Sequence, residues 1–588
     1  MLHALREYGA TLGGEPGFKS REVRWCIHVA ESGDLLNVIP LGDGNAGAML
    51  ERCADMHAMV SGGKAHFLVE SSQTIALNFK ADETKEKITS GLDRHRFFAA
   101  MLVNAATEVP LLTPIAELLS KLDRREALRV VMAEKRVKPA DWVTWQIGGI
   151  DPRPSEAVQS WWREWRRSDL RGDADGKSAT PASQMVCLLT GEIVSPQPTH
   201  SKISGLTGVG GLAMGDVLVG FDKASFQSYG LDKSSNAAMG AKAAQQYVDA
   251  LNHLIKQQQE AVRKNPSRRT NALMVYWFKE NIPPEDDPFS MLYGMDTEEQ
   301  KNVSALAQAR KLLDAIRSGA RANAGDNHYY AMTISGASGR VMVRDWMEGQ
   351  FAQLVANIEA WFADLSIAHR DGGSLAPDPK FLAIGGALVR ELKDLPASTT
   401  ATLWHAAVAN LPIPQPIVAQ ALNQFRSALL KDETFNHARM GLIKAYFIRK
   451  STEGEQHMKP HLNADHPDPA YHCGRLLAIL AKLQQSALGD VGAGVVQRFY
   501  SAASTAPGLT LGRLVSNARN HLGKLDGGLT YWYEQQIADV MGQLGDSIPR
   551  TLDLEGQGLF ALGYYQQLAA LRTSKKDGKD TQQNGDQS

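Results

Sequence analysis

The chain has 588 residues, with 63 basic and 64 acidic side chains and a formal net charge of −1 at pH 7. This balance excludes a freely acting basic DNA-binding protein. An apolar content of 43% and a charged content of 22% exclude wholesale disorder. The chain is too long for a single hydrophobic core, so we expect two to four domains.

Nothing in the sequence indicates a membrane protein or a secreted protein. No run of about 18 apolar residues predicts a membrane span. The N-terminus carries charge where a signal peptide needs an apolar region. Four widely spaced cysteines are typical of reduced thiols rather than of a disulfide framework. We therefore expect a cytoplasmic protein.

Residues 1–170 mix strand and helix signals. Trp25, Ile27 and Val29 alternate with polar residues, which predicts one arm of a hairpin. Trp161 and Trp165 are spaced to share a helix face, which favours packing in a core with the neighbouring arginines in solvent; stacking on nucleobases is the alternative. The further predicted elements are strands at 36–41, 66–69, 74–79 and 142–147, and helices at 93–106 and 113–135.

The rest of the chain changes from mixed to helical character. A polar segment at 171–184 is typical of a linker, and residues 573–588 are polar enough to predict disorder. Between them we predict a helix at 241–258, a strand at 271–278, a hairpin at 328–335 and 340–346, and helices from residue 351 onward. The predicted fold class is α+β. The predicted domains are an N-terminal α/β region (1–170), a central α/β region (185–350) and a helical C-terminal region (351–572).

Motifs that resemble catalytic sites lack the rest of their pattern. His369-Arg-Asp371 matches a kinase triplet, but no glycine-rich phosphate loop precedes it. The glycine-rich segment 205–215 lacks the Gly-Lys-Ser/Thr of a nucleotide-binding loop and favours close approach to a partner. Four histidines between His457 and His472 fit no common zinc spacing. We expect no enzyme activity, no metal and no cofactor.

Two basic segments could contact phosphate. Residues 121–138 hold seven basic and three acidic side chains, and residues 256–269 hold five basic side chains, including Arg268 and Arg269, against one acidic side chain. Both segments are either solvated helix faces or phosphate-binding patches.

Three motifs carry a family resemblance. They are Cys187-Leu-Leu-Thr-Gly-Glu192, Phe226-Gln-Ser-Tyr-Gly-Leu-Asp-Lys-Ser-Ser-Asn-Ala237 and Leu554-Glu-Gly-Gln-Gly-Leu-Phe-Ala-Leu-Gly-Tyr-Tyr-Gln-Gln567. With them, the chain resembles, over essentially its whole length, the large subunit of the type I-C CRISPR surveillance complex (Cascade). Ser71, Gln73, Met239 and Gln566 depart from the family pattern.

The resemblance implies a non-catalytic subunit of an RNA-guided DNA-binding complex in antiviral defence. Such a subunit recognises the motif flanking the target (PAM), assists duplex opening, stabilises the R-loop and recruits a helicase-nuclease. The implied partners are backbone subunits bound to guide RNA, and double-stranded target DNA. Ser72 and Gln73 are one candidate reading loop, and Lys202 with Lys233–Asn236 is the second. Contact of these loops with partner subunits is the alternative.

The resemblance also implies a small subunit translated internally, for which Met458 is a suitable start. Arg475, Arg498, Arg513 and Arg519 are candidates to line a groove for the displaced strand. A structural scaffold whose loops contact only protein is the second hypothesis for the whole chain. A nuclease of unrecognised type is the third.

Overall fold

The computed structural model describes residues 1–42, 47–56, 63–80, 82–172, 184–263, 270–293, 304–430, 436–451, 456–489, 494–545 and 548–583. The chain forms two compact units. The first consists of Met1–Ser204 and Met214–His253, and the second of Gly205–Ala213 and Leu254–Ser588. The division predicted at residues 170, 185, 350 and 458 stays a prediction.

A four-stranded sheet belongs to the first unit, with the strand order β3-β2-β6-β5. Its strands are β2 (Trp25–Val29), β3 (Leu35–Pro40), β5 (Glu70–Ser71) and β6 (Trp142–Ile147). β2 and β3 pair antiparallel, which confirms the predicted hairpin. Ile27 and Val29 are buried because alternate side chains of β2 face the core. A separate antiparallel pair joins β1 (Phe18–Val23) to β4 (Ala48–Ala54).

The strand pair predicted at 66–69 and 74–79 is wrong. Only Glu70 and Ser71 form a strand there, and helix α2 (Ser72–Ala76) follows at once. Leu77 ends this helix with a φ of 55°, which lies in the left-handed region and not in the strand region. Short apolar runs such as this one fit a buried helix turn as well as a strand.

Helices α3 (Lys85–Glu108), α4 (Thr113–Ser120) and α5 (Leu122–Glu134) confirm the helices predicted at 93–106 and 113–135. The second predicted helix is broken at Lys121, whose backbone is extended.

Helix α6 (Glu156–Gly172) carries the tryptophans, and their predicted place in a core is confirmed. Trp161 and Trp162 are buried, and Phe67 stacks on Trp162 with ring centroids 5.7 Å apart. The expectation that the arginines stay in solvent is wrong for Arg166, which is buried. This burial lowers the pKa of Arg166.

Irregular backbone dominates the region from Cys187 to Ala238. Strands β7 (Met185–Val186) and β8 (Ile193–Val194) form a two-stranded ribbon, and three 3-10 turns follow: η4 (Thr207–Val209), η5 (Ala224–Phe226) and η6 (Lys233–Ala237). Helix α7 (Ala241–Arg263) then confirms the helix predicted at 241–258. Helix α1 (Leu2–Thr11) packs against α7 at Gly9, where a Cβ atom would overlap the carbonyl oxygen of Gln246.

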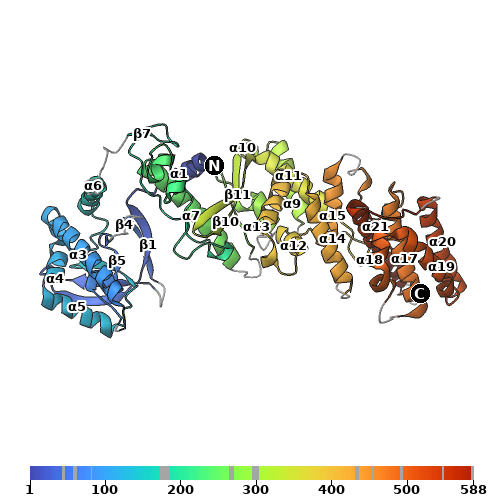
Figure 1. Ribbon diagram of the computed structural model, residues 1–588, viewed down its shortest axis with the longest axis horizontal. Helices are drawn as coiled ribbons and strands as arrows, with labels where there is room; N and C mark the ends of the chain where they lie inside the picture. The colour runs from blue at the N-terminus through green and yellow to red at the C-terminus, as the bar shows by residue number, and fades with distance from the viewer. Residues whose placement is uncertain are drawn as a thin grey trace. The chain divides into compact units, whose positions relative to one another are not determined.

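The second unit contains a three-stranded antiparallel sheet in the order β11-β10-β9, of which Figure 1 labels β10 and β11. Its strands are β9 (Leu273–Phe278), β10 (His328–Ala337) and β11 (Arg340–Gln350). Ala337 pairs with Arg340, and Ser338 and Gly339 between them both have positive φ, as a tight hairpin turn requires. The strand predicted at 271–278 and the second predicted hairpin are thereby confirmed.

Helices make up the ordered elements of the described chain after β11, shown in yellow to red in Figure 1, which confirms the α+β class. Their apolar side chains form one continuous core. These helices are α11 (Phe351–Leu365), α12 (Phe381–Gly386), α13 (Ala397–Val408), α14 (Gln415–Leu430), α15 (His437–Lys450), α17 (Pro469–Leu488), α18 (Val495–Thr505), α19 (Pro507–Leu522), α20 (Gly527–Leu544) and α21 (Leu554–Gln583).

The two segments predicted to lack order have different outcomes. Most of the predicted linker, residues 173–183, lies outside the described residues. In the predicted tail, α21 continues to Gln583, and residues 584–588 lie outside the described residues. Among the described residues, no helix is both long enough and apolar enough to cross a membrane.

Candidate nucleic-acid interface

Ser72 stands at the start of α2, next to the edge strand β5, and its side chain points inward. It is 0% exposed, and its hydroxyl donates to the carbonyl oxygen of Lys138 at 2.7 Å. The amide of Asn78 donates to the same hydroxyl at 3.2 Å. The expectation that Ser72 contacts a ligand therefore needs correction, because its hydrogen-bonding capacity is used to attach α2 to the turn before β6.

Gln73 is half-buried and lies next to an exposed basic turn. Its backbone N–H donates to the carbonyl oxygen of Pro139 at 3.0 Å, which holds it beside Lys138. Lys135, Arg136 and Lys138 are all exposed in this turn, which connects α5 to β6. The fold thus brings together the candidate reading loop and the end of the basic segment 121–138, although about 65 residues separate them in sequence.

Several basic side chains in the rest of the segment are paired with carboxylates or carbonyl oxygens. Arg124 forms an ion pair with Asp34 at 2.8 Å, and Arg129 forms one with Glu126 at 2.7 Å. Lys121 lies 3.6 Å from Glu117. These pairs favour the interpretation of a solvated helix face for the body of α5, and they leave the turn at its end as the more cationic part.

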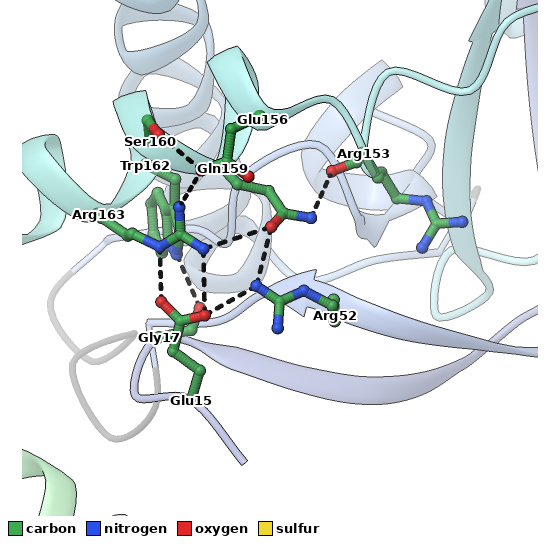
Figure 2. Close-up of polar contacts among 9 residues, drawn as sticks. All are labelled: Glu15, Gly17, Arg52, Arg153, Glu156, Gln159, Ser160, Trp162 and Arg163. Atoms are coloured by element: carbon green, nitrogen blue, oxygen red, sulfur yellow. Dashed lines mark hydrogen bonds and ion pairs between the residues drawn. The ribbon is translucent and has the colours of Figure 1, made fainter. Parts of the chain in front are cut away.

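A polar clamp holds the edge of this unit together (Figure 2). The carboxylate of Glu15 accepts hydrogen bonds from Arg163 at 2.6 Å and 3.2 Å and from Arg52 at 2.8 Å. Arg52 also donates to Gln159 on α6 at 2.8 Å. Arg163 is the largest cause of the lowered pKa of Glu15. The clamp ties the segment before β1 and strand β4 to α6.

Lys202 is exposed, and the glycine-rich segment beside it packs against the chain itself. A Cβ atom on Gly210 would lie 2.8 Å from the carbonyl oxygen of Gly336 in β10, and one on Gly336 would overlap the backbone of Gly211. The glycines at 210 and 211 therefore allow close approach to the turn end of β10 within the second unit, and the approach of this segment to a partner stays a prediction.

The Lys233–Asn236 loop is held by one side chain. Lys233 is exposed, with a φ of 48°. The amide group of Asn236 donates to the carbonyl oxygens of Leu231 at 2.7 Å and Lys233 at 2.9 Å, and its oxygen accepts from the Ser228 N–H at 3.0 Å. Asn236 therefore positions the loop from within. Tyr229, which the sequence prediction passed over, is 99% exposed in the same loop.

Burial shields Cys187 at the start of the motif region. It is 2% exposed. Burial alone would raise the pKa of Cys187, but hydrogen bonds from the Thr190 side chain and from the backbone of Gly240, Leu189 and Thr190 outweigh it and lower the pKa. The thiol is thus enclosed by its own turn.

The four C-terminal arginines do not share one environment. Arg475 is buried and donates to Gln567 at 2.9 Å and to the carbonyl oxygen of Ala464 at 3.0 Å. The expectation that Arg475 lines a groove is corrected by this placement. Arg498 on α18 and Arg513 and Arg519 on α19 are exposed, and α19 contains no acidic residue. Of the other basic candidates, Arg268 and Arg269 lie outside the described residues.

Two of the four histidines between 457 and 472 make structural contacts. His472 Nε2 lies 2.6 Å from the carbonyl oxygen of His466, and the ring of His466 stacks on Tyr471. Burial lowers the pKa of both His466 and His472. Within the described part of the chain, no group of three or more histidine, cysteine or acidic residues is arranged to hold a metal ion.

Comparison with protein-family models identifies the family of this chain. A search of curated proteins found no match. A family model described as CRISPR-associated protein (Cas_Csd1) matches residues 4–572, which is nearly the whole chain. The match supports the resemblance to a CRISPR large subunit that the three sequence motifs indicate. The chain belongs to the Cas_Csd1 family of CRISPR-associated proteins.

Proposed function

We propose that this protein is the non-catalytic large subunit of a type I-C RNA-guided DNA surveillance complex. In this role it recognises the flanking motif (PAM), assists duplex opening, stabilises the R-loop and recruits a helicase-nuclease. The observation that carries the proposal is the family match over residues 4–572. Guide RNA supplies the sequence specificity of such complexes, so a protein subunit needs to read only a short duplex and neutralise phosphate.

Gln73 and Lys138 form the best-supported reading surface. A glutamine amide can donate to and accept from a base edge, whereas a lysine contacts phosphate without reading sequence. The hydrogen bond from Gln73 N–H to the carbonyl oxygen of Pro139 holds the backbone of Gln73 next to the turn that carries Lys138. The pair therefore suits a short duplex whose backbone and base edge are contacted together.

Exposed cations elsewhere suit the strands of an opened duplex. Lys202 and Lys233 are exposed on the loops of the motif region, where Asn236 holds the backbone in place. Arg498, Arg513 and Arg519 are the proposed contacts of the displaced strand, since exposed arginines on an acid-free helix attract phosphate.

The proposed partners are backbone subunits with guide RNA, target DNA and a separate helicase-nuclease. A small subunit starting at Met458 would contain the helices α17 to α21. Detection by mass spectrometry of a second product beginning at Met458, and its loss in Met458→Leu, would support this part. A single full-length product would refute it.

The proposal is tested by purifying the chain with the other subunits and guide RNA and by measuring binding to duplexes with altered flanking motifs. Affinity should depend on the flanking motif, and binding indifferent to that motif would refute motif reading. The isolated chain should not cleave DNA with divalent metal present. Such cleavage would favour the nuclease hypothesis instead.

Two variants separate reading from phosphate contact. Gln73→Ala should reduce discrimination between flanking motifs and leave the salt dependence of binding unchanged. Lys138→Ala should weaken binding to all motifs and reduce the slope of log affinity against log salt by about 1. Lys242→Ala, at an exposed lysine on α7, is the matched control. Identical binding by all three variants would refute the assignment of this surface.

A scaffold that contacts only protein is the second candidate function. Val186, Leu188 and Ile193 are exposed around the β7–β8 ribbon, and such apolar side chains favour protein contact. Under this hypothesis, Gln73→Ala and Lys202→Ala leave DNA affinity unchanged, and substitutions at Val186 or Ile193 reduce assembly.

A further inference from the structure

The loop that carries Lys233 and Asn236 displays an aromatic side chain on an unusual turn. Leu231 N–H donates to the carbonyl oxygen of Ser228 at 2.9 Å, which closes a four-residue turn around Tyr229 and Gly230. Tyr229 has a φ of 54° and Gly230 a φ of 71°. Positive φ at both central residues is the pattern of a type I′ turn.

A tyrosine is a poor residue for the first central position of this turn. Asparagine, aspartate and glycine dominate there, because other side chains crowd the backbone in the left-handed region at a cost of about 1–2 kcal/mol. The Tyr229 side chain is also 99% exposed, so it gains no burial within the chain in return. Strain of this kind persists where the surrounding structure holds it, and it is concentrated at functional sites.

The surrounding loop does hold the turn. Asn236 accepts from the Ser228 N–H before Tyr229 and donates to the carbonyl oxygens of Leu231 and Lys233 after it. Ser234 N–H donates to the carbonyl oxygen of Pro198 at 3.2 Å, which anchors the far end of the loop. The ring is therefore presented from a fixed backbone, so little conformational entropy is lost when it meets a ligand.

We propose that Tyr229 stacks on a nucleobase exposed where the target duplex opens. This inference rests on the proposed function. Ser228 and Gly230 flank Tyr229 along the chain, and an exposed ring held in this way can stack on the flat face of a base. Exposed Lys233 lies four residues further on, where a cation can meet the phosphate of the same strand.

Tyr229→Asn removes the ring and places a residue that the turn prefers. The purified complex with guide RNA should assemble as the wild type does, and the variant should melt at the same or a higher temperature. Its affinity for target duplex should fall about tenfold, in the range that removal of one base–aromatic stack produces. Tyr229→Phe and Tyr229→Trp should restore the affinity, because both retain a stacking ring.

A scan with abasic nucleotides identifies the stacked base. A single abasic site is moved through the first positions of each target strand beside the flanking motif. One position should weaken the wild-type complex about tenfold and leave Tyr229→Asn unaffected, because the two changes remove the same contact. No such position, or equal affinity of Tyr229→Asn and wild type, would overturn the inference.

The same measurements separate this inference from the proposed function. Wild-type binding that depends on the flanking motif, together with normal binding by Tyr229→Asn, would refute the stacking role alone. Wild-type binding indifferent to the motif would refute the proposed function. Loss of complex assembly in Tyr229→Asn would overturn the inference in favour of a protein contact.

Discussion

The crossing of α17 and α21 depends on two glycines, and Gly474→Ala tests it. A Cβ atom on Gly474 would lie 2.8 Å from the backbone nitrogen of Tyr564 and closer still to the carbonyl oxygen of Phe560. A Cβ atom on Gly563 would in turn overlap the carbonyl oxygen of Tyr471. The two helix backbones therefore touch at this point, and neither can accept a methyl group without moving away.

Two opposing effects set the size of the change. Alanine is favoured over glycine inside a helix by about 1 kcal/mol. An added methyl group in a packed site costs about 1–3 kcal/mol, and the upper end applies because the obstacle is backbone rather than a side chain that can rotate. We therefore expect Gly474→Ala to destabilise this helix pair by about 2 kcal/mol.

Gly512→Ala on α19 is the matched control. Apart from the adjoining backbone of its own helix, no described atom lies within 4 Å of a Cβ placed on Gly512, so only the gain in helix propensity remains. This variant should stabilise the region by about 0.5–1 kcal/mol. The double variant Gly474→Ala/Gly563→Ala should lose less than the sum of the single losses, because the first methyl group already separates the helices.

Hydrogen exchange on the full-length protein measures these effects. Peptides from α17 and α21 should exchange about 30-fold faster in Gly474→Ala, which corresponds to about 2 kcal/mol, while peptides from the first unit stay unchanged. Exchange in Gly474→Ala that is equal to wild type, or slower as in Gly512→Ala, would refute the close crossing.

Three further predictions concern buried or clamped charges. Arg475→Ala should lower the free energy of unfolding, measured in urea, by about 2–3 kcal/mol. The substitution leaves the side chain of Gln567 and the carbonyl oxygen of Ala464 without their donor. A loss as small as that of the exposed control Arg498→Ala would contradict this. Burial lowers the pKa of His466 from 6.5 to about 4, so the unfolded chain binds more protons between these values and stability falls as pH drops through them. The thermal midpoint should be lower at pH 5 than at pH 7, and an equal drop in His466→Gln would exclude this residue as a cause. Glu15→Gln should cost about 1 kcal/mol in thermal unfolding by weakening the clamp with Arg163, and an unchanged midpoint would show that the clamp adds no stability.

The sequence by itself determined the local elements whose signals lie within a few residues. Alternating apolar residues predicted β2, a continuous apolar run predicted β9, and paired turn residues predicted the β10–β11 hairpin, because side-chain pattern and turn chemistry act locally. The three motifs also identified the family. The same local reasoning failed at Thr74–Phe79, where a short apolar run fits a helix turn as well as a strand.

The tertiary structure decided which polar residues are available. Ser72 and Arg475 belong to residue types that suit DNA contact, yet each is buried and donates to an acceptor from a distant part of the chain, the carbonyl oxygen of Lys138 and the side chain of Gln567 respectively. Sequence spacing cannot show this, because a donor turns inward only when folding brings an acceptor within about 3 Å. Long-range pairing also acts at the edge of the first sheet. There the pairing of β5 with β6 places the backbone of Gln73 against Pro139, next to Lys138. Residue type therefore indicated which side chains are candidates for DNA contact, and tertiary packing determined which of these side chains are exposed.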